Sequence, residues 1–223
     1  FLRRSLISCR RFFFPYAHAG HAALFPLCHR AENIGRFKLS AGVRDDANWL
    51  IRMVENLKEE DRVLFLISGG GSALFEYPVI SPEELSDVTR QLLACGAEIT
   101  EINTVRKRIS AVKGGKFAQL CAPAHVYSVI LSDIIGDPLD MIASGPAYPD
   151  SSTCSQAWDV IHKYGIKISE ETEKCLDVET PKELHNVTTM VTGSVKQLCH
   201  AAAETAAELG YEPVILTDRL ACQ

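Results

Sequence analysis

Short apolar runs alternate with amphipathic segments along most of the chain, from about residue 41 onward. The apolar runs are rich in Val, Ile and Leu, which is typical of strands buried on both faces of a parallel sheet. The amphipathic segments repeat their apolar residues at helical spacing. This order predicts an α/β fold with a mostly parallel, Rossmann-like sheet and helices on both faces. The predicted strands are 62–67, 126–131, 187–191 and 212–216, and the predicted helices are 45–58, 82–95, 99–112, 154–164, 169–178 and 194–209.

The helix that follows the first predicted strand carries signals at both of its ends. Ser81 stands at the N-cap position, Pro82 at the first helical position and Glu84 three residues after the cap, and the segment closes at Gly96. Proline suits the first turn of a helix because its φ is already helical. Serine followed by glutamate at this spacing predicts a capping box, in which each side chain bonds the other residue's backbone.

The first forty residues differ in composition from the rest of the chain. They contain seven Lys or Arg against one acid, Glu32, so the remaining residues hold 16 bases and 27 acids. This segment shows neither sustained helical nor sustained strand periodicity. It fits a mitochondrial targeting segment, a basic surface arm, or sequence that does not belong to the domain. We therefore divide the chain into a basic segment, 1–40, whose role stays open, and one α/β domain, 41–223.

Charge and cysteine content narrow the class of partner. The acidic body lacks the basic residues that neutralise phosphates, which argues against nucleic-acid binding. Eight cysteines without a CxxC motif or regular spacing predict reduced thiols, and neither a zinc site nor a disulfide framework. No apolar run reaches the ~20 residues of a membrane span, so no membrane partner is expected. The composition predicts a cytoplasmic protein that binds small molecules.

Three loops rich in Gly, Ser and Thr follow the predicted strands, at 68–74 (SGGGSAL), 132–138 (SDIIGDP) and 192–194 (TGS). Open α/β sheets bind their ligands at the carboxyl ends of the strands. The glycines of the first loop can turn several N–H groups toward an anion, although a tight turn explains them equally well. The loop lacks the lysine of GxxxxGK[ST] and the last glycine of GxGxxG. Its candidate phosphate-binding residues are Ser68, Gly69, Gly70, Gly71 and Ser72.

A basic segment of the otherwise acidic body lies at 101–116 (EINTVRKRISAVKGGK). On a helix Asn103 and Arg106 share one face, and Lys113 follows on the next turn. Arginine offers a planar fork to a carboxylate or phosphate, and lysine offers a mobile point charge. We predict that these residues bind substrate carboxylate or phosphate, with Lys107 as a further candidate. A solvated basic surface is the alternative.

Two aspartates, Asp133 and Asp137, lie in the loop after the second strand, and Ser132 begins that loop. Carboxylates at such a position can hold Mg²⁺ with phosphate oxygens or accept a proton from a hydroxyl, and turn formation is the alternative. We predict Asp133 as a catalytic residue, Asp137 as a metal ligand and Ser132 as a phosphate-binding residue. Arg106 and Lys113 complete the predicted catalytic set. Such a set suits phosphoryl transfer, where catalysis is mainly positioning and charge neutralisation.

Four sequence blocks occur in one order: LFLISGGGSAL, EINTVRKRISAVKGGKFA, VILSDIIGDPLDMIASGP and VTGSV. Together they resemble the amino-terminal domain of the glycerate 2-kinases that carry a MOFRL domain at their carboxyl end. The resemblance covers roughly residues 41–218. It implies transfer of the γ-phosphoryl group of ATP, with Mg²⁺, to the 2-hydroxyl of D-glycerate. Glycerate is then the small-molecule partner, and a homodimer is compatible with the resemblance.

Three features of that family have no match in this sequence. They are a Gly-Lys-containing segment with a proposed catalytic lysine, a Gly-His-Pro stretch, and the MOFRL domain itself. We therefore expect an incomplete kinase that is inactive alone. Two other functions stay open, a hydroxypyruvate reductase, against which the missing GxGxxG counts, and a non-catalytic phosphosugar-binding module.

Overall fold

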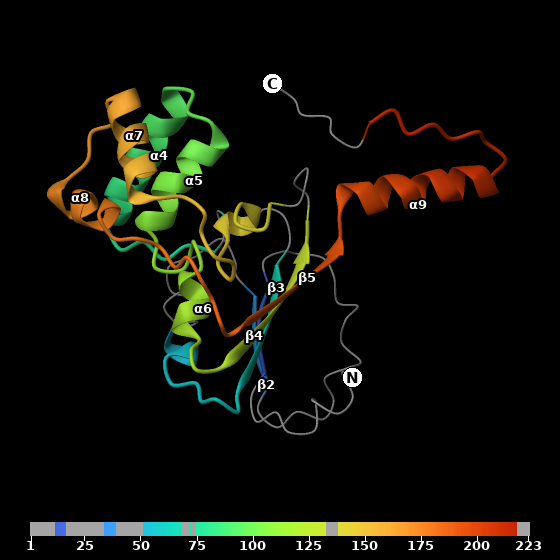
Figure 1. Ribbon diagram of the computed structural model, residues 1–223, viewed down its shortest axis with the longest axis horizontal. Helices are drawn as coiled ribbons and strands as arrows, with labels where there is room; N and C mark the ends of the chain where they lie inside the picture. Colours follow the sequence, from blue (N-terminus) through green and yellow to red (C-terminus); the bar gives the residue numbers. More distant parts are fainter. Residues whose placement is uncertain are drawn as a thin grey trace.

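A single parallel sheet forms the centre of the computed structural model, which describes residues 12–16, 34–38, 51–67, 72, 75–132 and 138–217, the first two segments as backbone only. Its strand order is β2-β1-β3-β4-β5, and every pair is parallel (Figure 1). The predicted α/β class with a parallel sheet is confirmed. The strands are β1 (Phe12–Tyr16), β2 (Ile34–Lys38), β3 (Arg62–Ile67), β4 (His125–Leu131) and β5 (Val187–Gly193).

Three of the four predicted strands lie where the pattern placed them. β3 has the predicted bounds, β4 begins one residue earlier and β5 ends two residues later. The fourth prediction is wrong, because residues 212–216 form no strand and their side chains are exposed. A short apolar run becomes a strand only where a neighbouring strand can pair with it, and none of the strands in the described ranges pairs with this run. The first forty residues, where the pattern predicted no strand, contribute β1 and β2.

The helices also follow the predictions closely, except that two are clearly shorter than expected and the short helix at Lys116–Leu120 was not predicted. Of the predicted helix 45–58, residues 51–54 are helical, residues 55–58 form a turn and irregular backbone instead, and residues 45–50 lie outside the described residues. The predicted helix 99–112 ends at Arg108, and Ser110 then forms an antiparallel bridge with Pro78. The described helices are α4 (Pro82–Ala94), α5 (Ile99–Arg108), α6 (Lys116–Leu120), α7 (Cys154–Tyr164), α8 (Glu170–Leu176) and α9 (Val195–Glu208).

The start of α4 confirms one half of the predicted capping box and corrects the other. Ser81 Oγ accepts a hydrogen bond from Glu84 N at 3.1 Å. The Glu84 carboxylate does not return to Ser81 and instead accepts from Ser169 N at 2.9 Å and from Thr172 Oγ1 at 2.6 Å. It therefore joins the first turns of α4 and α8, because a tertiary partner with two donors replaces the local one.

The buried apolar side chains form two separate cores. The first lies along the sheet and includes Phe65, Phe75 and Phe117, whose ring centroids are 4.8 to 5.4 Å apart. The second lies among α4, α5, α7 and α8, with Val88, Leu92 and other side chains that exclude water. Figure 1 shows these four helices gathered to one side, beyond the end of the sheet to which the strand arrows point. The chain crosses between the two cores through α5 and the turn that follows it.

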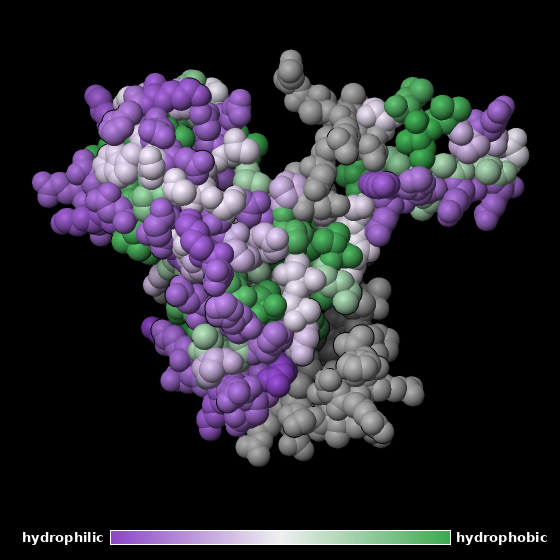
Figure 2. All heavy atoms as spheres, viewed as in Figure 1, coloured by the Kyte–Doolittle hydropathy of each residue, from purple (hydrophilic) through white to green (hydrophobic). Residues whose placement is uncertain are grey.

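The last described segment extends away from both cores. α9 projects from the end of β5 and has no buried residue (Figure 1). Apolar side chains are exposed on it and on the segment after it, as the hydropathy colouring of Figure 2 shows. These include Leu198, Leu209, Tyr211, Val214 and Leu216. Among the described residues no helix combines the length and the apolar character needed to cross a membrane.

Candidate functional site

Ser72, at the carboxyl side of β3, lies within reach of two cations. Lys113 Nζ donates to the backbone oxygen of Ser72 at 2.7 Å and to that of Phe75 at 3.1 Å. Arg106 Nη2 approaches the same Ser72 oxygen at 3.4 Å. The sequence predicted that Ser72, Arg106 and Lys113 act together, and the structure brings them together. We use the term Ser72 cluster for Ser72, Glu76, Asn103, Arg106, Lys113 and Ser144.

Glu76 is the carboxylate of the Ser72 cluster. Its Oε2 accepts from Arg106 Nη2 at 3.0 Å and lies 3.6 Å from Lys113 Nζ. Its Oε1 and Arg106 Nε are buried and have no hydrogen-bond partner among the described residues. Two cations thus share one carboxylate, so the cluster has an excess of positive charge and spare hydrogen-bonding capacity. A ligand with anionic character suits both properties.

The two cations of the Ser72 cluster differ in how deeply they are buried. The Lys113 side chain is fully buried, and loss of hydration lowers its pKa to about 8, against the opposing effect of Glu76 and with the repulsion of Arg106. Arg106 keeps 17% of its side chain exposed. Arg106 is therefore the cation that a ligand can reach directly, whereas the Lys113 ammonium is directed at backbone oxygens.

Three polar side chains of the Ser72 cluster form a hydrogen-bonded chain. Ser144 Oγ donates to Asn103 Oδ1 at 3.0 Å, and Ser72 Oγ lies 3.1 Å from Ser144 Oγ. Ser144 is fully buried and has a left-handed backbone, with φ 62°. Such a conformation is uncommon for a residue other than glycine and persists where surrounding contacts impose it. Here Gly114 N donates to Ser144 O at 3.0 Å and fixes the backbone from the opposite segment.

The predicted Gly-Gly turn after α5 makes this approach possible. Gly115 has φ 82° and donates its N–H to Gly145 O at 2.7 Å. A Cβ on Gly145 would stand 2.8 Å from the backbone oxygen of Asp140, which is closer than real Cβ contacts allow. Glycine is therefore required at Gly145 both by its positive φ and by this contact. The close pairing of these two segments holds Ser144 beside α5.

Lys107 does not join the Ser72 cluster. Its Nζ donates to Asp150 Oδ1 at 2.9 Å and to Asp140 Oδ2 at 3.4 Å, and Ser151 Oγ donates to the same Asp140 oxygen at 2.8 Å. Successive helical residues point about 100° apart, so Lys107 faces away from its neighbour Arg106. Its predicted role in phosphate binding stays a prediction.

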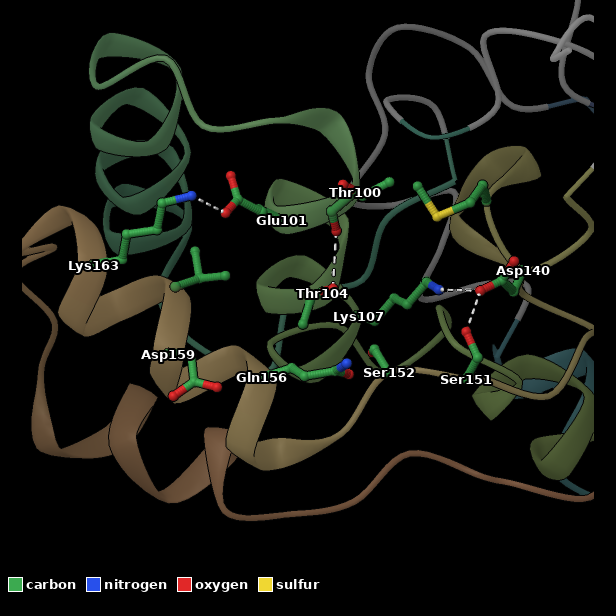
Figure 3. Close-up of a pocket in the computed structure, with 12 residues that line it drawn as sticks. Thr100, Glu101, Thr104, Lys107, Asp140, Ser151, Ser152, Gln156, Asp159 and Lys163 are labelled. Carbon is green, nitrogen blue, oxygen red and sulfur yellow. Dashed lines mark hydrogen bonds and ion pairs between the residues drawn. The ribbon is translucent and has the colours of Figure 1, made fainter.

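A cavity of about 480 Å³ opens on the Lys107 side of α5. Figure 3 shows Lys107 beside Asp140, and Lys163 directed at Glu101 from the opposite wall. Lys163 Nζ and Glu101 Oε1 form an ion pair of 2.6 Å, which lowers the pKa of Glu101 to about 2. The cavity is lined by polar residues of α5, α7 and the 140–152 segment, including Thr100, Thr104, Ser151, Gln156 and Asp159.

The remaining predicted site residues lie in or beside loops that are only partly described. Ser132 is buried at the end of β4, where its N–H donates to Gly193 O at 2.9 Å. Its place at the carboxyl edge of the sheet is the one expected for a ligand-binding loop. Ser68, Gly69, Gly70, Gly71, Asp133 and Asp137 lie outside the described residues.

Sequence reasoning missed Glu76 and Ser144. Glu76 follows Ser72 by one helical turn's length of chain, in a segment without periodicity, and nothing in the pattern marks it as buried. Ser144 belongs to the quoted block VILSDIIGDPLDMIASGP, and the SGP triplet was the available signal, because serine before Gly-Pro is typical of a constrained turn.

The described part of the site offers no ligand set for Mg²⁺. Nowhere in the described ranges do three His, Cys, Asp or Glu side chains gather in a way that could hold a metal ion. Glu76 already pairs with Arg106 and Lys113, whose charges would repel a metal cation. Asp137, the predicted metal ligand, and Asp133 lie outside the described residues.

Comparison with known proteins relates this architecture to one family and to several enzymes. Residues 40–177 match the family described as Domain of unknown function (DUF4147). That range contains every residue of the Ser72 cluster. Over 176 residues the chain is 49% identical to D-glycerate 2-kinase of Thermotoga maritima. This match covers 78% of this chain and 42% of that protein. A glycerate kinase from human is 38% identical over 175 residues, with 74% of this chain and 34% of the human protein covered.

A solved structure shows the same fold. The crystal structure of a glycerate kinase from Thermotoga maritima superposes with a TM-score of 0.78 at 36% identity, and the match covers 96% of this chain and 58% of that one. The chain thus spans less than half the length of the two curated relatives described above and somewhat more than half of the solved structure.

Proposed function

The chain belongs to the family described as Domain of unknown function (DUF4147), and from this membership we propose that it takes part in ATP-dependent phosphorylation of D-glycerate to 2-phosphoglycerate. The observation that carries the proposal is the Ser72 cluster, which lies inside the matched range and has an excess of positive charge at the carboxyl edge of a parallel sheet. Glycerate and ATP are both anions, and phosphoryl transfer depends on positioning and on neutralising charge. The identity to glycerate 2-kinases supports the same substrate.

Within this proposal the two cations of the Ser72 cluster have different roles. Arg106 is partly exposed, and its buried Nε has no partner within the described ranges, so it binds the substrate carboxylate or a phosphate group. Lys113 is fully buried and donates to the Ser72 and Phe75 oxygens, so it acts by fixing the end of the glycine-rich loop. The predicted catalytic role of Lys113 thus becomes one of positioning.

ATP and Mg²⁺ remain part of the proposal through loops 68–71 and 133–137. Glycine-rich backbone at 68–71 would supply N–H groups to a phosphate. Asp133 and Asp137 would hold the metal or accept the proton of the 2-hydroxyl. Bound Mg²⁺ would neutralise charge on the transferred phosphoryl group. Asn103 and Ser132 complete the set of substrate-binding residues.

We extend the proposal to a cytoplasmic location and a homodimer. The five described cysteines, Cys95, Cys121, Cys154, Cys175 and Cys199, are free thiols, which suits a reducing compartment. Light scattering of the purified chain tests the dimer, since a monomeric mass at micromolar concentration contradicts it.

The proposed function is tested by transplanting the matched range into an active relative. Residues 40–177 of this chain replace the corresponding part of the Thermotoga maritima D-glycerate 2-kinase, and formation of 2-phosphoglycerate from D-glycerate and Mg-ATP is followed by a coupled assay. We expect activity within about tenfold of the relative, and a loss of about 100-fold or more when Arg106→Ala removes the reachable cation.

A matched arginine serves as the control for this assay. Arg52, in the helical turn 51–54, is exposed and lies outside the Ser72 cluster. Arg52→Ala should leave the rate unchanged. A chimera that folds but forms no 2-phosphoglycerate, or one that keeps full activity after Arg106→Ala, contradicts the proposed function.

A further inference from the structure

The hydrogen-bonded chain in the Ser72 cluster has a direction. The Asn103 oxygen can only accept, so the bond between Ser144 and Asn103 uses the single hydroxyl proton of Ser144. Ser144 Oγ can then take part in its bond with Ser72 only as the acceptor, and Ser72 must donate. The proton of Ser72 therefore points at Ser144. The two lone pairs of Ser72 Oγ are left to accept hydrogen bonds from other groups.

The backbone of Ser144 indicates that its hydroxyl is used. Ser144 has φ 62°, a conformation that glycine adopts without cost and other residues do not. A glycine there would remove the strain and the hydroxyl together. Ala143, the preceding residue, has φ 52° and offers a matched case of the same strain without a hydroxyl. Serine at position 144 therefore keeps a polar group in a place where the backbone conformation alone favours glycine.

We propose that Ser144, braced by Asn103, is a positioning residue that holds Ser72 Oγ as a hydrogen-bond acceptor for a hydroxyl group of the substrate. This inference rests on the proposed function, because it takes a hydroxy acid as the ligand. Ser72 lies beside Arg106, which offers a charged donor to the carboxylate of the same molecule. A hydroxy carboxylate can therefore give its proton to Ser72 and its charge to Arg106, whereas an anion without protons can use only Arg106.

The hydrogen-bonded chain from Ser72 through Ser144 to Asn103 orients a hydroxyl and does not deprotonate it. It ends at the amide oxygen of Asn103, which cannot take up a proton at neutral pH. Any proton that entered at Ser72 would have nowhere to leave. The base of the proposed reaction must therefore be another group, and the contribution of Ser72 is to fix the geometry of the hydroxyl.

The test measures binding of two probes to the wild-type chain and to Ser144→Gly, by isothermal titration calorimetry. The probes are D-glycerate, which carries hydroxyl donors, and sulfate, which only accepts. In Ser144→Gly the Ser72 proton is released and can turn toward the ligand. We expect D-glycerate to bind about tenfold more weakly, as for loss of one oriented hydrogen bond, and sulfate to bind equally or more tightly. Thermal unfolding should show little net change in stability, because relief of the strained backbone offsets loss of the hydroxyl that donates to the buried Asn103 Oδ1.

Two further variants separate positioning from simple structural support. Ala143→Gly relieves the same kind of strain and should raise the melting temperature with both affinities unchanged. Ser72→Ala should weaken D-glycerate to the same extent as Ser144→Gly, and the double variant should be no weaker than either. That non-additivity is expected only if Ser144 acts through Ser72.

Several results would overturn the inference. Equal weakening of D-glycerate and sulfate in Ser144→Gly would show a general loss of the site, and unchanged D-glycerate affinity in Ser72→Ala would remove the assigned acceptor. Absence of D-glycerate binding to the wild-type chain would also overturn it. The proposed function is judged separately, since an inactive chimera contradicts that function alone even when D-glycerate binds through Ser72.

Discussion

The basic run Arg106-Lys107-Arg108 supplies two clusters of buried charge that differ in how completely they are satisfied. Arg106 joins the Ser72 cluster, where two cations share Glu76 and two buried polar atoms have no partner in the described part of the chain. Lys107 and Arg108 join a second cluster around Asp150, defined here with Ser152 and Thr180. Neighbouring residues of one helix therefore serve two different environments.

The Asp150 carboxylate is fully hydrogen-bonded, and one buried atom of its cluster, Arg108 Nε, has no hydrogen-bond partner among the described residues. Asp150 Oδ1 accepts from Lys107 at 2.9 Å and from Ser152 N at 3.1 Å, and Oδ2 accepts from Ser152 Oγ at 2.8 Å and from Thr180 at 2.7 Å. Arg108 donates to Ser152 Oγ and to its backbone oxygen, both at 3.0 Å. Saturated buried networks stabilise one arrangement, whereas spare capacity beside partial exposure is typical of a binding site. The Asp150 cluster is thus structural, and the Ser72 cluster is the candidate for chemistry.

The largest expected effect on stability comes from removing the carboxylate of the Asp150 cluster. Asp150→Ala leaves Lys107 and Arg108 buried without their shared carboxylate, so we expect the free energy of unfolding to fall by about 3–5 kcal/mol. Urea denaturation followed by circular dichroism measures it. Asp159→Ala, an exposed aspartate on α7, is the matched control and should change stability by less than about 0.5 kcal/mol. A loss below about 1 kcal/mol for Asp150→Ala would mean that the network does not hold the helices.

The pH dependence of stability tests the Ser72 cluster through its fully buried cation, Lys113. Burial lowers the pKa of Lys113 to about 8, below the 10.5 of the unfolded chain. Between these values the unfolded state binds more protons, so stability should rise with pH, by up to about 1.4 kcal/mol per pH unit for one group. Lys113→Met should remove this contribution, measured as the slope of unfolding free energy between pH 8 and pH 10.

A second buried lysine provides the comparison for that slope. Lys116 donates to the backbone oxygens of Arg108 and Ser110, and burial likewise lowers its pKa to about 8. Lys116→Met should remove a contribution of similar size and leave D-glycerate binding intact, because Lys116 lies outside the Ser72 cluster. If the slope of Lys113→Met equals that of the wild type, the pKa of Lys113 is not lowered in the folded protein.

The two clusters also show what sequence patterning can and cannot establish. Apolar periodicity and caps placed β3, α4 and α7, because local propensity and burial agree there. The helical spacing placed Asn103 and Arg106 in one cluster correctly, whereas Lys113 lies beyond the end of α5 and reaches Ser72 from the segment that follows. The same run did not reveal that Lys107 turns to Asp150, 43 residues later in the chain, because such a partner depends on tertiary packing. Glu76 and Ser144 were missed for the same reason.

The smallest expected effect lies at the rim of the Asp150 cluster. Glu179 contacts Arg108 at 3.3 Å and Lys182 at 2.9 Å, but 46% of its side chain is exposed, so water screens both pairs. Its Oε1 also accepts from Cys154 N at 2.7 Å, at the first turn of α7. Glu179→Gln removes the charge and keeps an oxygen for that N–H. We therefore expect a loss of at most about 1 kcal/mol in urea unfolding. A loss of unfolding free energy as large as that of Asp150→Ala would place Glu179 among the essential partners of Arg108. The Asp150 cluster would then extend to the surface.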